Sequence, residues 1–266
     1  MTNKDDIIEQ PDVKTGFDDL LEDLFGLNIR SVRSLKALFV KPSEYFKAAK
    51  TKDWGGQQFT PSPRLWIGLI AITVATRFLW GDTDGAFMQV MSEQAQAGFE
   101  IGLRDNPDVD ASNIDWTESI QKMFDISMLI QPFMMVAVMM LLATMVRFWG
   151  EPLTYVVRLR YLFAIIIPAS VVNLIATIMI FMVPTRFMTA VSISQLVIMI
   201  VLYTLTSLLG PFKGQARDSA IPKAVVLTII LFVAVMIANM IAQTIAMGIV
   251  LIPDIAKATI EAKAAG

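Results

Sequence analysis

Two residue types are missing from this sequence of 266 residues, which contains no cysteine and no histidine. Without cysteine, the chain can form no disulfide, offers no thiolate nucleophile and cannot bind a metal through sulfur. Without histidine, it lacks the commonest general base, the usual zinc and haem ligand and the simplest switch near neutral pH. These absences argue against most redox, metal-dependent and acid–base enzymes. We therefore expect a protein with no enzymatic activity, no metal and no cofactor.

Charged residues are also scarce, because they make up 17% of the chain while hydrophobic residues make up 55%. Four segments run for about 20 residues or more without a charge, which is enough to cross a hydrocarbon core of about 30 Å as a helix. They cover residues 126–146, 162–183, 188–209 and 224–252, and a weaker candidate, with Arg77 in its last turn, covers 65–80. We therefore predict an all-α integral membrane protein built as a bundle of five transmembrane helices.

The distribution of charge predicts the orientation of this bundle, because Lys and Arg concentrate in cytoplasmic segments near the ends of spans. Residues 30–64 contain eight basic and two acidic residues, whereas residues 81–125 contain ten acidic and two basic ones. The connections at 147–160 and 210–223 each carry three basic residues and one acidic residue. We expect a cytoplasmic N-terminus and an extracytoplasmic C-terminus, in a membrane such as the bacterial inner membrane.

These features divide the chain into four parts. Residues 1–29 form a partly disordered cytoplasmic segment, 30–62 a basic juxtamembrane segment, 63–252 the five-span domain with its acidic extracytoplasmic loop at 81–125, and 253–266 an extracytoplasmic tail. Amphipathic spacing predicts two further helices, in DDLLEDLFGLNI of the first part and in GAFMQVMSEQAQAGFEIGL of the acidic loop. Asp115 and Glu118 have the spacing of a capping box, which predicts the start of a helix.

The stretch SVRSLKALFVKPSEYFKAAK, residues 31–50, is basic and amphipathic and is interrupted by Pro42. Because proline cannot continue a helix comfortably, we predict an elbow of two short helices, the second beginning near Ser43. A cationic amphipathic pair beside a span is typical of helices that lie on the inner leaflet. The residues predicted to contact lipid or a partner are the basic Arg30, Arg33, Lys36, Lys41, Lys47 and Lys50 and the apolar Val32, Leu35, Leu38, Phe39, Tyr45 and Phe46. In the alternative, the apolar face packs on the spans of the chain itself, and both can hold at different ends of the elbow.

The last predicted span contains a ribbon of small residues, because alanine recurs there at every fourth position. Small side chains allow close approach of helices within a membrane, so the ribbon predicts a tight helix contact, either within the bundle or with another subunit. The residues concerned are Ala234, Ala238, Ala242 and Ala246, flanked by Asn239 and Gln243. The other polar groups of the spans either bond neighbouring helices, which we favour, or line a path across the membrane.

Three pieces of the sequence, RSLKALFVKPSEYFKAA, RLRYLFAIIIPAS and YTLTSLLGPFKGQARDSAIPKAV, resemble the Yip family of membrane proteins and its bacterial relatives. The resemblance implies a cytoplasmic N-terminal region and five spans. For eukaryotic members it implies roles in membrane traffic and contacts with small GTPases, and for bacterial members it implies no established activity. The long acidic outer loop departs from the family pattern, so no functional residue is transferred.

These observations favour a non-enzymatic membrane protein that acts through contacts, either as an accessory subunit of a membrane complex or as a membrane-organising scaffold. The expected partners are anionic membrane lipids and another membrane protein or a second copy of the chain, and no nucleic acid. The alternative is a transporter or channel for a neutral or lipidic substrate. It would require a continuous polar path or an open apolar groove between the helices.

Overall fold

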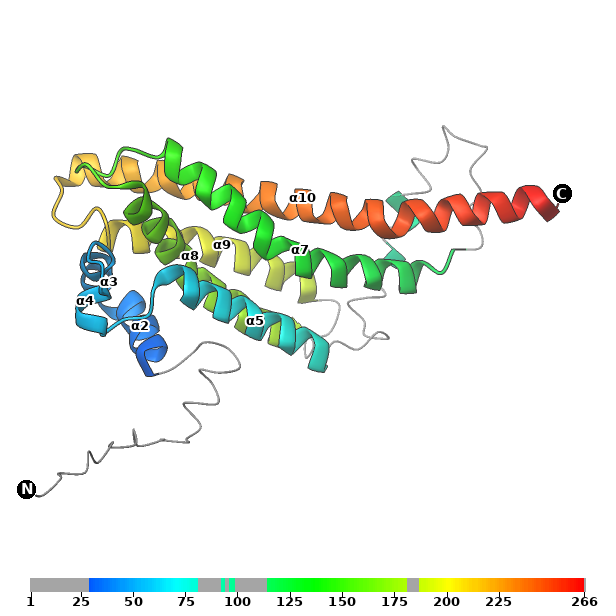
Figure 1. Ribbon diagram of the computed structural model, residues 1–266, viewed down its shortest axis with the longest axis horizontal. Coiled ribbons are helices and arrows are strands. Elements are labelled where there is room, and N and C mark those ends of the chain that lie inside the picture. The colour runs from blue at the N-terminus through cyan, green and yellow to red at the C-terminus, as the bar shows by residue number, and fades with distance from the viewer. Residues whose placement is uncertain (1–28, 81–91, 94–95, 99–113, 181–186, 266) are drawn as a thin grey trace, which may run out of the picture.

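The computed structural model describes residues 29–80, 92–93, 96–98, 114–180 and 187–265. The predicted acidic helix before residue 29 and most of the predicted outer-loop helix lie outside the described residues. Where the chain is described, long helices form an elongated bundle and three short helices, α2 to α4, lie at one end of it (Figure 1). The two parts correspond to the predicted spans and the predicted elbow.

Four helices of the bundle are long and apolar enough to cross a membrane. They are α7 (Trp116–Met145), α8 (Tyr155–Ile180), α9 (Met188–Leu209) and α10 (Arg217–Ala265). A fifth helix, α5 (Ser62–Trp80), has 19 residues and packs along α8. The α7–α8 and α9–α10 connections lie at the same end as the short helices, and the C-terminus lies at the opposite end (Figure 1).

Helices α7 and α10 extend beyond the apolar runs from which the spans were predicted. Helix α7 begins at Trp116, where the Asp115 carboxylate accepts a hydrogen bond of 3.0 Å from the Glu118 N–H, so the predicted helix start is confirmed. Helix α10 has 49 residues and continues through Pro253, which gives it a length of about 74 Å. The predicted tail after residue 252 is therefore part of this helix. The Ser119 hydroxyl donates to the Asp254 carboxylate at 2.6 Å, which ties α10 to α7 directly after the proline.

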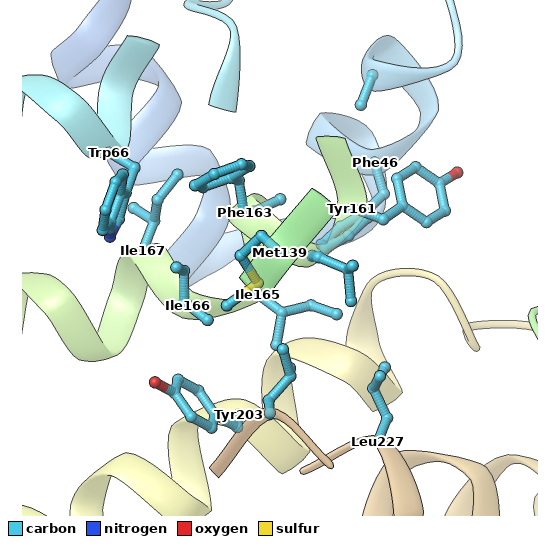
Figure 2. Close-up of a cluster of buried hydrophobic side chains, with 14 of the residues drawn as sticks. Phe46, Trp66, Met139, Tyr161, Phe163, Ile165, Ile166, Ile167, Tyr203 and Leu227 are labelled. Carbon is cyan, nitrogen blue, oxygen red and sulfur yellow. The ribbon is translucent and has the colours of Figure 1, made fainter. Parts of the chain in front are cut away.

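Helix α8 lies at the centre of the bundle. Its residues 161–167 are all buried, which means that this stretch is covered on every side. Trp66 of α5, Met139 of α7, Tyr203 of α9 and Leu227 of α10 gather around it (Figure 2). The core extends into the end of the bundle that carries the short helices, where it includes Leu38, Phe46 and Trp149.

The short helices form the predicted elbow. Helix α2 (Ile29–Val40) ends just before Pro42, and α3 (Pro42–Ala49) begins with that proline in its first turn. Proline is tolerated there because the first turn of a helix has no internal partner for its N–H groups. The third element, α4 (Trp54–Gln57), is a single left-handed turn in which all four residues have positive φ, from 54° to 69°.

Candidate functional site

The inner side of α2 is held to the bundle end by a buried cluster of hydroxyl groups around Thr60. Ser31 and Thr60 share a hydrogen bond of 3.0 Å between their hydroxyls, and the Thr60 N–H donates to the Ser34 hydroxyl at 2.8 Å. The Tyr45 hydroxyl donates to the Thr60 carbonyl at 2.7 Å. All four residues are buried, so every polar group of Thr60 has a partner away from water.

Helix α3 turns its aromatic side chains inward. Tyr45 lies against Trp54 and Phe59, and the ring of Phe46 meets Tyr161 of α8 edge-on at 4.9 Å between centroids. Burial raises the pKa of the Tyr45 hydroxyl well above its usual range, although a hydrogen bond with Ser62 lowers it in part. Tyr45 therefore remains a neutral hydrogen-bond donor at any physiological pH.

Arg160 of α8 fastens the C-terminal end of α3. Its guanidinium donates to the Ala49 carbonyl at 2.9 Å and to the Thr51 carbonyl at 2.8 Å. The same group lies over the Trp54 ring, 4.9 Å from its centroid. Carbonyls at the end of a helix have no partner within it, and a cation there also favours the helix dipole. The charge pattern of the sequence indicates only a cytoplasmic cation at Arg160 and does not predict this role.

The elbow therefore buries part of the surface that we predicted for lipid or partner contact. Leu38, Tyr45 and Phe46 are at most 2% exposed against the chain itself, and Leu35 is half-buried. For these residues the burial agrees with the alternative in which the apolar face packs on the chain itself. The amphipathic pattern shows which side of α2 is apolar, but it does not indicate that Ser31 and Ser34 have buried partners 26 or more residues away.

The other predicted contact residues are exposed and divide between two surfaces. Helix α2 turns apolar and basic side chains away from the bundle, and we call this surface the outer face: Ile29, Val32, Arg33, Lys36, Phe39 and Val40. Ile29 and Val40 belong to it although they were not among the predicted contact residues. Arg30 and Lys41 are exposed at its edge. Lys47 of α3 and Lys50, which directly follows α3, are exposed and line a pocket between α3, the α7–α8 connection and the α9–α10 turn.

The alanine ribbon lies in the part of α10 that packs along α7. Gln131 of α7 donates to Asn239 of α10 at 2.6 Å, and the Ser119–Asp254 bond fixes the same antiparallel register further along. Ala238, Ala242 and Ala246 are 0% exposed within the single chain. The burial of these alanines within one chain agrees with the first of the two predicted alternatives, a contact inside the bundle. Gln243 is exposed and Asn239 is half-buried.

A second hollow lies midway along the bundle and has a volume of about 310 Å³. It is lined from α5, α7, α8, α9 and α10 and collects four carboxamides, which form two pairs. One is the Gln131–Asn239 pair, and in the other the Gln195 amide donates to the Asn173 side-chain carbonyl. Four amides from four helices around one hollow were not predicted as a group, because each is isolated in the sequence. Among the described residues, no group of three or more carboxylates is placed to hold a metal ion.

The chain was compared with protein-family models, with curated proteins and with solved structures, and no match was found in any of the three comparisons. The resemblance to the Yip family therefore rests on the three quoted pieces of sequence. Whatever function is proposed has to come from the geometry described above.

Proposed function

We propose that the chain is a non-enzymatic integral membrane protein of five spans that organises or assists other membrane components from the anionic inner leaflet. In this proposal α5 is the first span, the N-terminus is cytoplasmic and the C-terminus is extracytoplasmic. The basic connections and the elbow share one end of the bundle, and positive charge of this kind marks the cytoplasmic end. Helix α5, with 19 residues, is about 28 Å long, close to the thickness of a hydrocarbon core.

The outer face of α2 is the observation that carries the proposal. Ile29, Val32 and Val40 are 60 to 67% exposed and Phe39 is 46% exposed, although the opposite side of the same helix is fixed by buried hydrogen bonds. A helix held on one side and apolar and cationic on the other suits the headgroup region of a membrane. Each basic residue near an anionic surface contributes about 1 kcal/mol, and Arg33 and Lys36 lie among the apolar side chains.

A fluorescent probe at residue 32 tests this contact, and the absence of cysteine makes Val32→Cys a unique labelling site. In nanodiscs that contain anionic lipid, we expect an environment-sensitive dye at this position to emit in the blue and to be quenched by lipid-attached quenchers. Dye at Glu44→Cys, on the exposed side of α3, is the matched control and should report water. Arg33→Glu with Lys36→Glu should return the residue 32 probe to water. A probe that reports water in every disc would contradict the proposal.

A separate experiment tests the number of spans by comparing the sides of the membrane from which two introduced cysteines are labelled. With five spans, Lys52→Cys and Ser219→Cys lie on the same side of the membrane and should react together with an impermeant reagent. If α5 does not cross, the two positions lie on opposite sides and label from opposite sides. The result does not depend on whether α2 touches lipid.

The amide-lined hollow favours a second candidate function, the passage of a small neutral solute that forms hydrogen bonds. Each carboxamide has two donor hydrogens and an acceptor oxygen, so the pairs retain groups that can bind a solute. The proposal ranks second because the amides also satisfy one another without any solute. Uptake of urea or glycerol into proteoliposomes tests this second candidate. If uptake is no faster than into empty liposomes, transport of these solutes is excluded. Faster uptake that is lost in Gln131→Leu would support it.

A further inference from the structure

The pocket at the elbow end is a feature that the proposed contact of α2 does not use. It has a volume of about 440 Å³ and lies between α3, the α7–α8 connection and the α9–α10 turn. Lys47 and Lys50 enter it from α3, Glu151 from the α7–α8 connection and Lys213 from the α9–α10 turn. The four groups are far apart in the sequence, and only the fold brings them to one pocket.

Close backbone contacts and side-chain hydrogen bonds hold the walls of the pocket in place. The Gln215 amide donates to the Trp149 carbonyl at 2.7 Å, and its oxygen accepts from the Lys223 ammonium at 2.9 Å. A Cβ atom at Gly210 would lie 2.4 Å from the ring of Phe46, so glycine is required for this ring to rest on the α9–α10 turn. The pocket is therefore formed before any ligand binds.

The pocket has an excess of positive charge. Lys50 forms an ion pair of 2.5 Å with Glu151, which neutralises one of the three ammonium groups. Lys213 donates to the neutral Ser43 hydroxyl at 3.1 Å, and no ion pair of Lys47 or Lys213 is found among the described residues. Two ammonium groups therefore remain without a compensating carboxylate around one hollow, which favours an anion with several acceptor oxygens.

We propose that this pocket binds a phosphate ester. The two lysines, the Ser43 hydroxyl and the Gln215 amide supply donors for the phosphate oxygens. The volume exceeds that of a phosphate group, and Trp149, Tyr161 and Phe46 form an aromatic wall against which an attached organic group can lie. The ester can be the headgroup of a lipid at the inner leaflet or a soluble metabolite, since both present the same chemistry.

Binding to the purified full chain in non-ionic detergent tests the proposal with three probes: inorganic phosphate, glycerol 3-phosphate and a short-chain phosphatidic acid. We expect saturable binding of at least one ester, measured by tryptophan fluorescence and by a rise in the unfolding temperature. Binding of phosphatidic acid alone identifies a lipid headgroup, whereas equal binding of glycerol 3-phosphate identifies a soluble ester. If neither ester binds saturably, the proposal is wrong.

Variants locate the binding within the pocket. Lys47→Gln with Lys213→Gln should weaken binding at least tenfold. Lys52→Gln, at an exposed cation outside both the pocket and the outer face of α2, should change it less than twofold. Glu151→Gln should strengthen binding several-fold because it releases Lys50, and this variant removes no cation from the pocket. Unchanged binding in both the lysine and the glutamate variants would overturn the assignment to this pocket, even if an ester binds elsewhere.

Discussion

At the elbow end, helices α2 and α3 are fixed by hydrogen bonds to hydroxyl and carbonyl groups, whereas along α7 and α10 the close contacts are made by alanines. The first region uses Thr60 and Arg160 as multivalent partners. The second has one amide pair, Gln131–Asn239, and the Ser119–Asp254 bond near the far end, beside a run of fully buried methyl groups. One chain thus fixes helices in two different ways at two depths.

The difference follows from the solvent expected at each place. Near the end of the bundle, polar groups can exchange with water, so a few buried and well-aligned hydrogen bonds decide which helix face turns inward. Between long apolar helices, lipid is as apolar as leucine, and attraction has to come from close packing of small residues. The outer face of α2 and the basic pocket are accessible at this polar end, where hydrogen bonds hold the helices in place.

The largest effect is expected from filling the alanine ribbon. Ala238→Leu with Ala242→Leu should destabilise the chain by about 1 to 3 kcal/mol at each site, because the added atoms force α10 away from α7. The measurement is the unfolding temperature in mild detergent. Ala256→Leu, an exposed position on the same helix, is the control and should unfold close to the unmodified chain. A double variant that is as stable as this control would show that the ribbon makes no close contact.

A smaller and local effect is expected from Arg160→Ala. The change leaves the Ala49 and Thr51 carbonyls without their donor and removes the contact with Trp54, which we expect to cost about 2 to 3 kcal/mol. Arg160→Lys should recover only part of this, because an ammonium cannot reproduce the planar fork. Hydrogen exchange should rise in residues 42–57 and remain low in α7 and α10. Lys52→Ala, which removes a nearby exposed cation, is the control and should leave hydrogen exchange unchanged. If Arg160→Ala instead raises exchange uniformly along the chain, the elbow is not a separate unit of stability.

The bounds of the helices could be predicted from the sequence better than the side of each helix that packs inward. Residues 188–209 were predicted as a span and α9 has those bounds, because a charge-free run that ends at Gly210 specifies both length and end. Pro42 likewise located the break in the elbow. Local signals of this kind depend on neighbouring residues, so they can be read without knowing the fold.

The candidate sites depended on pairings that no local signal contains. Ser31 and Ser34 look like surface residues until Thr60 is placed beside them, and Lys213 looks like a residue of a simple turn until α3 is packed against it. The partners are separated by 26 to 170 residues. Periodicity within a helix cannot predict contacts over such distances. For this reason the sequence left the inward-packing side of α2 undecided and gave no indication of the basic pocket.

The smallest predicted effect compares two glycines with equally open surroundings, one in each region. A Cβ atom at Gly56 in α4 or at Gly248 in α10 would meet nothing within 4 Å, so neither substitution creates a clash. Gly56, however, has a φ of +69°, where an L-residue costs about 1 to 2 kcal/mol. Gly248 lies within a regular helix, where alanine is better than glycine by about 1 kcal/mol.

Gly56→Ala should therefore lower the unfolding temperature of the elbow, and Gly248→Ala should leave that of the bundle unchanged or raise it slightly. Both variants add one methyl group in open surroundings. A difference between their effects on stability therefore comes from backbone conformation and not from packing. The measurement is hydrogen exchange of residues 42–57 for the first variant and global unfolding in detergent for the second. If both substitutions stabilise, α4 does not hold its left-handed turn in solution, and the position of Trp54 has to be fixed by its contacts with Tyr45 and Arg160.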